Sequence, residues 1–325
     1  MDVGKAEKLA GEVLAELSDV VVVEERVLRV ILTGVVSRGH VLLEDVPGTG
    51  KTLTARAFAT ALGLSFGRIQ FTPDLLPADV TGTYIFNEKT REFEFKEGPI
   101  FANVILADEI NRASPKTQAA LLEAMEEGQV SMDGTTHDLP DPFFVIATQN
   151  PVEQGEGTFR LPEAQKDRFL VKSSLGYPDA AGELELLNRR ETREQSTPSA
   201  SQVLEPETVR ALQRVPEDVR VHDDLKRYIV DLVRVTRDDA RVEVGVSPRG
   251  CQKLFEIVRG WAALAGREYA TPDDVKAVAE PVMTHRLGLT AEATVEGTEE
   301  RDVVDDLLAD LPVPSVGYET QRPTD

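Results

Sequence analysis

A glycine-rich turn between an apolar strand and a helix constrains this chain more than any other feature. Residues 41–52 read VLLEDVPGTGKT, and a helix-forming stretch follows at residues 53–62. Backbone N–H groups at a helix N-terminus bind anions, a lysine adds a mobile positive charge, and a threonine hydroxyl can ligate Mg²⁺. The sequence therefore predicts a phosphate-binding loop made of Pro47, Gly48, Thr49, Gly50, Lys51, Thr52 and Leu53.

The loop departs from the usual phosphate-binding pattern at its first position. That pattern starts with a glycine, and this chain has Asp45 there. The alternative interpretation is an ordinary strand–turn–helix with a solvated lysine. Two strands further along the chain favour the phosphate-binding interpretation.

An acidic pair ends the next predicted strand. Residues 103–107 (NVILA) are followed by Asp108 and Glu109. Ligands of open α/β sheets bind at the carboxyl edge of the strands, so carboxylates there can serve a bound nucleotide. We expect Asp108 to hold Mg²⁺ together with Thr52, and Glu109 to orient and deprotonate the attacking water. The alternative is that the pair only caps a helix beginning near Ser114.

A third strand carries an amide at its end. Residues 143–148 (FFVIAT) lead into Gln149, Asn150 and Pro151. Asn-Pro alone is a common turn. Because Asn150 follows the third strand of the series, we expect it to hold the attacking water from the other side.

Four motifs in this order resemble the MoxR family of AAA+ ATPases: DVPGTGKT, LADEINRASPKTQ, ATQNP and LPEAQKDRF. The resemblance covers about residues 20–314. It implies an α/β fold, with a RecA-like αβα core around a parallel sheet, followed by a small all-helical lid. It also implies assembly into a homo-oligomeric, hexameric ring, with ATP and Mg²⁺ as cofactors. The Walker A, Walker B and sensor 1 residues that it implies are Lys51, Thr52, Asp108, Glu109 and Asn150.

Two arginines complete the implied site. Arg249 in VSPRG matches sensor 2, and Arg168 in DRF matches the arginine finger that a ring inserts into a neighbour's site. Arg112 and Arg160 are competing candidates for the finger, because one sequence cannot show which arginine reaches another subunit's γ-phosphate. The alternative for each is a surface or interface salt bridge. Members of the family carry Val-Gly-Gln where the adenine docks, and residues 20–25 (VVVVEE) depart from it, so the base contacts stay open.

The resemblance and the turn signals divide the chain. Residues 82–87 and 91–95 flank a polar turn, and residues 129–132 precede an Asp-Gly turn, so both regions predict β-hairpins. These insertions resemble the helix-2-insert clade, whose hairpins approach the channel of the ring. Alternatively, both hairpins only pack on the core.

The expected parts of the chain are an N-terminal helical segment (1–35), the nucleotide-binding core (36–176), a helix and linker (177–201), the helical lid (202–314) and a flexible tail (315–325).

Composition and charge limit the binding partners and the cellular compartment that we expect for this chain. A formal net charge of −21 argues against a broad affinity for nucleic acid or anionic lipid. The single cysteine, Cys251, excludes an internal disulfide framework and favours the cytoplasm. No apolar run approaches the roughly 20 residues that a membrane span needs. Acid excess with few lysines predicts a halophilic archaeal source, and the competing interpretation is an acidic bacterial protein.

The expected function is ATP hydrolysis coupled to the remodelling or maturation of partner proteins. The family implies chaperone-like activity, metal or cofactor insertion, and a von Willebrand factor type A domain protein as partner. Three alternatives stay open: a magnesium-chelatase-type motor subunit, a DNA helicase-type motor, and a nucleotide-gated scaffold with little turnover. Nothing in the chain identifies the protein client.

Overall fold

The computed structural model describes residues 1–150, 158–159, 161–192 and 198–314. The chain forms two compact units: Lys8–Gln213, and Met1–Glu7 together with Arg214–Asp325. The finer domain limits expected from the sequence remain a prediction, and the expected tail (315–325) and part of the expected linker lie outside the described residues.

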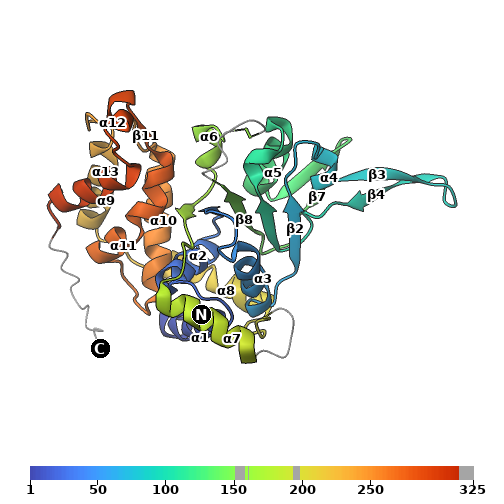
Figure 1. Ribbon diagram of the computed structural model, residues 1–325, viewed down its shortest axis with the longest axis horizontal. Helices are drawn as coiled ribbons and strands as arrows, with labels where there is room; N and C mark the ends of the chain where they lie inside the picture. The colour runs from blue at the N-terminus through green and yellow to red at the C-terminus, as the bar shows by residue number, and fades with distance from the viewer. Residues whose placement is uncertain (151–157, 160, 193–197, 315–325) are drawn as a thin grey trace, which may run out of the picture. The chain divides into compact units, whose positions relative to one another are not determined.

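A five-stranded parallel sheet forms the centre of the larger unit (Figure 1). Its strand order is β2–β5–β8–β1–β9. Its strands are β1 (Val41–Glu44), β2 (Phe66–Gln70), β5 (Val104–Asp108), β8 (Phe144–Gln149) and β9 (Val171–Ser173). The inner strands β5 and β8 are almost continuously apolar and buried, as expected of a parallel sheet with helices on both faces. β1 lies between β8 and β9, so the strand order reverses beside the predicted phosphate-binding loop. Open α/β sheets bind their ligands at such a point.

Helices cover this sheet. α2 (Glu25–Val36) packs against β9, and α3 (Lys51–Ala61) packs against β2 and β5. α5 (Pro115–Glu127) begins at Ser114, whose side chain accepts a hydrogen bond from the Thr117 backbone N–H. The other helices of this unit are α1 (Val3–Val20), which belongs to it from Lys8 onward, α4 (Pro77–Thr81), η1 (Ile110–Arg112), α6 (Glu163–Lys166), α7 (Ala180–Thr192) and α8 (Pro206–Leu212).

Both predicted hairpins are present. β3 (Gly82–Asn87) and β4 (Glu92–Glu97) form a long arm that extends away from the sheet (Figure 1). β6 (Gln129–Met132) and β7 (Thr135–Asp138) form the second hairpin, whose two turn residues, Asp133 and Gly134, both have positive φ.

Aromatic side chains join the two hairpins. The His137 ring of β7 stacks on the Phe95 ring of β4 with centroids 3.9 Å apart, and it shares a 3.2 Å hydrogen bond with the Tyr84 hydroxyl of β3. Farther out on the arm, Phe86 and Phe93 contact each other and are exposed, Phe93 by 69%. Phe95 therefore packs between the two hairpins.

The second unit is predominantly helical. Its main helices are α9 (Asp223–Val235), α10 (Pro248–Leu264), α11 (Pro272–Met283), α12 (Ala291–Val295) and α13 (Glu300–Asp310), with short 3₁₀ turns at η2 (Val215–Asp218) and η3 (Thr284–Arg286). Ser247 caps α10, and Thr271 and Asp274 form a capping box at α11, in both cases with proline at the first helical position. One short antiparallel pair, β10 (Val242–Val244) with β11 (Gly288–Leu289), interrupts the helices.

The parallel sheet and the helical second unit confirm the predicted fold class. In the parts of the chain that the structure describes, no helix combines the length and the apolar character needed to cross a membrane.

Candidate active site

The predicted phosphate-binding loop borders a cavity of about 430 Å³ at the carboxyl ends of β1, β5 and β8. The described residues that line the cavity are Pro47, Gly48, Gly50, Lys51, Thr52, Leu53, Asp108, Glu109, Thr148, Gln149 and Asn150. The structure therefore brings the predicted loop, acidic pair and amide to one place. Thr49 is not among the lining residues, and its hydroxyl donates to the Val46 carbonyl at 3.4 Å.

The loop geometry depends on two glycines. Gly48 and Gly50 have φ of 92° and 91°, in the left-handed region that favours glycine. A Cβ at either position would meet nothing within 4 Å, so conformation and not space requires glycine there. Gly50 precedes the first turn of α3, which leaves the N-terminal N–H groups of that helix at the cavity. Lys51 Nζ donates to the carbonyls of Asp45 and Val46 at 2.9 and 2.8 Å.

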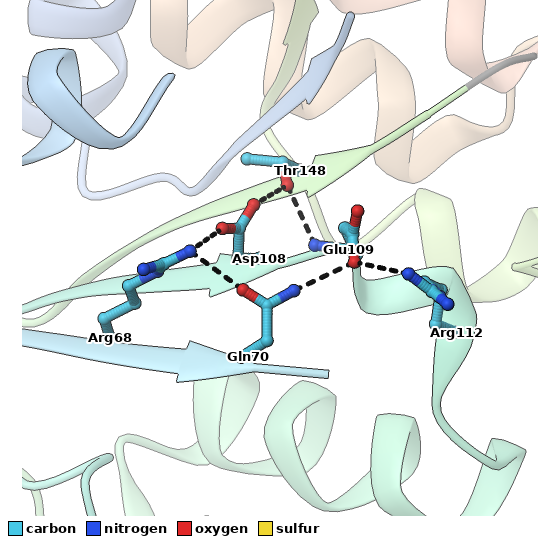
Figure 2. Close-up of polar contacts among 6 residues, drawn as sticks. All are labelled: Arg68, Gln70, Asp108, Glu109, Arg112 and Thr148. Atoms are coloured by element: carbon cyan, nitrogen blue, oxygen red, sulfur yellow. Dashed lines mark hydrogen bonds and ion pairs between the residues drawn. The ribbon is translucent and has the colours of Figure 1, made fainter. Parts of the chain in front are cut away.

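The acidic pair lies in a polar network that the sequence did not reveal (Figure 2). Asp108 Oδ1 accepts a hydrogen bond from the Thr148 hydroxyl, and Oδ2 accepts one from Arg68 Nη2, both at 2.7 Å. The Arg68 Nη2 group also donates to Gln70 Oε1 at 2.9 Å. The Asp108 carboxylate is therefore oriented from both neighbouring strands, β8 and β2.

Glu109 occupies a conformation that is rare for a residue with a side chain. Its φ is 56°, in the left-handed region, where a non-glycine residue costs about 1 kcal/mol or more. Its backbone N–H donates to the Thr148 hydroxyl at 2.9 Å. Its Oε2 accepts from Gln70 Nε2 at 2.9 Å and from Arg112 Nη1 at 3.1 Å. These contacts fix the carboxylate at the mouth of the cavity.

Sequence reasoning missed Arg68, Gln70, Thr148 and Gln149 as parts of this site. The available signal was the pair of polar residues two positions apart in the short strand β2, which places Arg68 and Gln70 on one face. Only the strand pairing shows their importance, because Gln70 lies opposite Asp108 in the β2–β5 register.

Among the predicted arginines that the structure describes, none is a lining residue of this cavity. Arg168 follows α6 and forms an ion pair with Glu126 of α5 (Nε to Oε2, 3.3 Å), and it is not among the described residues lining the cavity. Arg112 contacts Glu109 of its own chain. Arg249 belongs to α10 in the second unit. Arg160 lies outside the described residues. The roles expected for Arg168 and Arg249 thus remain predictions.

A second cavity of about 580 Å³ lies in the same unit, beside residues 20–25, where the base contacts stayed open. Its described lining includes residues of two segments: Val21, Val22, Val23, Glu24 and Val27 from the first, and Ser174, Leu175, Gly176, Tyr177 and Pro178 from the second. Arg189 of α7 also lines it and donates to the backbone carbonyls of Asp19 and Ser18 at 2.8 and 3.1 Å. A partly apolar wall of this kind suits a flat heterocycle.

The donor set near Lys51 fits Mg²⁺ bound with a nucleotide. The Thr52 hydroxyl and the Asp108 carboxylate are hard oxygen donors on one cavity, and Mg²⁺ in phosphate-transfer sites takes few protein ligands. Within the described ranges, no cluster of three or more His, Cys, Asp or Glu residues could hold a metal ion independently.

Comparisons with known proteins agree with this geometry. Residues 40–171 match the ATPase family associated with various cellular activities (AAA), and residues 234–307 match the AAA lid domain. YeaC of Bacillus subtilis is 48% identical over 306 residues, which cover 94% of this chain and 95% of YeaC. Chaperone MoxR1 of Mycobacterium tuberculosis is 41% identical, over 98% of this chain and 88% of MoxR1. The crystal structure of a candidate ATPase from Cytophaga hutchinsonii superimposes with a TM-score of 0.88 at 38% identity, covering 96% of both chains.

Proposed function

The chain belongs to the MoxR family of AAA ATPases and hydrolyses ATP, and from this premise we propose that it is a motor that remodels or matures partner proteins. The observation that carries the proposal is the single cavity shared by Lys51, Thr52, Asp108, Glu109 and Asn150. Insertion of a metal or cofactor into a partner is the form of maturation that we propose.

The proposed chemistry assigns one task to each side chain. Lys51 and the N–H groups at the start of α3 bind the β- and γ-phosphates. Thr52 and Asp108 would hold Mg²⁺, which when bound supplies positive charge to the phosphate oxygens. Glu109 accepts the proton of the attacking water, and Asn150 holds that water from β8. Thr148 supports both acids, because its hydroxyl contacts the Asp108 carboxylate and the Glu109 N–H.

We propose that the nucleoside part of ATP occupies the second cavity. Two observations support this: Val21–Val23 supply apolar surface for a base, and Leu175 and Gly176, which also line the cavity, donate hydrogen bonds to Asp45 at the start of the phosphate loop. The proposal identifies base contacts that the sequence left open.

A hexameric ring completes the proposed site. Arg168 of one subunit would stabilise charge at the γ-phosphate of its neighbour, and Arg249 would act from the lid. The Arg168 side chain pairs with Glu126 at a partly exposed site, so a neighbour's phosphate can exchange for this weak partner. In such a ring, turnover per subunit rises with protein concentration until assembly is complete.

The β3–β4 arm is the proposed contact for client proteins. The arm extends away from the sheet (Figure 1), and its aromatic pair, Phe86 and Phe93, offers exposed apolar surface. A von Willebrand factor type A domain protein is the proposed partner, and the cytoplasm is the proposed compartment. The acidic composition supports work in concentrated salt, as in a halophilic archaeon.

The test is ATP hydrolysis in high-salt buffer by wild type and Glu109→Gln across protein concentrations. Wild type should turn over cooperatively. Glu109→Gln should bind ATP but lose about 100-fold or more in kcat, because it lacks the general base. Glu123→Gln, an exposed acid on α5, is the matched control and should retain activity.

Two outcomes would contradict the proposed motor function. A turnover per subunit that stays constant on dilution would exclude a site completed by a neighbour. If wild type and Glu109→Gln both bind ATP and neither hydrolyses it, even with a von Willebrand factor type A domain protein added, the nucleotide-gated scaffold becomes the better account.

A further inference from the structure

Asp45 occupies the position where phosphate-binding loops usually have glycine, and it is buried, with 5% of its surface exposed. Its carboxylate accepts three hydrogen bonds: from the Ser174 hydroxyl at 2.7 Å, from the Leu175 N–H at 2.7 Å and from the Gly176 N–H at 3.0 Å. A buried carboxylate is costly unless donors satisfy it, and hydrogen bonds to a charged acceptor are stronger than neutral ones. The three donors therefore form a built site for this side chain.

The backbone of Asp45 has a second set of partners. Its carbonyl accepts from Lys51 Nζ at 2.9 Å, and its N–H donates to the Gln149 carbonyl at 3.2 Å. Lys51 and Gln149 both line the phosphate cavity. One residue thus connects the phosphate loop, the end of β8 and the segment after β9.

The segment held by the carboxylate is a wall of the second cavity. Ser174, Leu175 and Gly176 line that cavity together with Val21–Val23. Gly176 has a φ of 69°, so the chain bends there in a conformation that glycine favours. The position of this wall relative to the phosphate loop therefore depends on the Asp45 carboxylate.

We propose that Asp45 is a positioning residue that sets the nucleoside pocket relative to the phosphate loop, and so contributes to recognition of the base and ribose and not of the phosphates. The inference rests on the proposed function, because it takes the second cavity as the nucleoside site. Asn in place of Asp45 would turn its amide N–H₂ group, itself a donor, toward the donors that now contact one of the two carboxylate oxygens. The wall would then have to shift while the loop glycines and Lys51 stay unchanged.

The experiment compares two ligands by calorimetry on the full-length protein: MgATP, and inorganic tripolyphosphate with Mg²⁺, which lacks base and ribose. Asp45→Asn should weaken MgATP binding about tenfold while tripolyphosphate binding changes less than about twofold. In turnover, KM for ATP should rise more than kcat falls. Glu44→Gln is the matched control. Glu44 contacts Lys172 and Gln149 and is not bonded to residues 174–176 of the second cavity, so this variant should preserve the ratio of the two affinities.

Ser174→Ala provides a milder variant, should Asp45→Asn fail to fold by circular dichroism. It removes one of the three donors and should weaken MgATP about threefold with no change for tripolyphosphate. Equal losses for both ligands would overturn the inference, since they would show a general role in shaping the loop. Unchanged binding of both would also overturn it. If wild type itself bound no MgATP, the proposed function would fail as well, so the two failures are distinguishable.

Discussion

Gln70 Nε2 donates a 2.9 Å hydrogen bond to Glu109 Oε2, from the end of β2 to the residue that follows β5 (Figure 2). Arg112 donates to the same oxygen at 3.1 Å. Two protein donors therefore occupy one oxygen of the carboxylate that, in the proposed mechanism, accepts the proton of the attacking water. Gln70 also accepts from Arg68, which binds Asp108, so the proposed metal ligand and the proposed general base share one network.

Removing Gln70 should release the general base. We expect Gln70→Ala to raise the basal kcat for ATP about fivefold, because a typical hydrogen bond contributes about 1 kcal/mol. The KM for ATP should change little, since Gln70 does not line the phosphate cavity. Steady-state hydrolysis at saturating MgATP measures both. Gln129→Ala, at the start of β6, is the control, and a decrease in kcat for Gln70→Ala would show that Gln70 orients Glu109 for catalysis.

Arg168 should act on a neighbouring subunit. Arg168→Ala should lower kcat by about 10³, with ATP binding retained, because an arginine finger stabilises charge in the transition state. Lys51→Ala should lose ATP binding but still offer its own Arg168. Mixing the two inactive variants should restore activity, because some pockets with Lys51 then meet a neighbour with Arg168. Arg112→Ala mixed with Lys51→Ala serves as the comparison: recovery there, and none with Arg168→Ala, would assign the finger to Arg112.

Much of the fold could be predicted because its signals are local. Apolar runs ending in Asp108 or Gln149 mark buried strands whose last residues are polar, and Ser247 and Thr271 mark helix starts by their capping chemistry. The pair β10–β11 was missed because strands of 3 and 2 residues are too short for an alternation pattern.

The parts of the site that were not predicted depend on contacts between residues distant in the sequence. Asp45 looked like a defect of the loop pattern, and its partners at 174–176 are found only after β9 has paired with β1. Arg68 and Gln70 acquire their partners from the β2–β5 register, which a single sequence does not encode in readable form. One chain does not show which side chain reaches a neighbouring subunit, so the role of Arg168 as the arginine finger remains a prediction.

The second unit should lose stability in acid through Asp239. Arg241 donates hydrogen bonds to this carboxylate at 2.9 and 3.1 Å, and this contact, the largest cause, holds the pKa of Asp239 below its ordinary value of 3.8. Because the pKa is lower in the folded state, the stabilisation is fully present above the unfolded value. It is lost as the pH falls through the folded pKa, that is, below about pH 4.

Asp239→Asn should therefore reduce the free energy of unfolding near neutral pH and flatten its decline in acid. Arg241 also binds Asp306 of α13, so the variant should loosen that helix first. Urea unfolding followed by circular dichroism between about pH 3 and 7 measures both effects. Asp238→Asn, an exposed neighbour, is the control. Parallel pH profiles for wild type and Asp239→Asn would mean that this carboxylate does not set the acid limit.

The charge of the chain predicts how its stability responds to salt. With 57 acidic and 36 basic residues, the folded state carries a formal charge of −21, and self-repulsion opposes compaction. The screening length falls from about 10 Å at 0.1 M to about 3 Å at 1 M salt, so KCl should relieve this repulsion. We expect the midpoint of thermal unfolding to rise by about 3 °C or more over that range, equivalent to about 1 kcal/mol.

Sorbitol at matched osmolality is the control, because a neutral solute stabilises by exclusion without screening charge. A midpoint that peaks near 0.1 M, or that rises equally with sorbitol, would argue against adaptation to concentrated salt and leave the acidic surface as an aid to solubility.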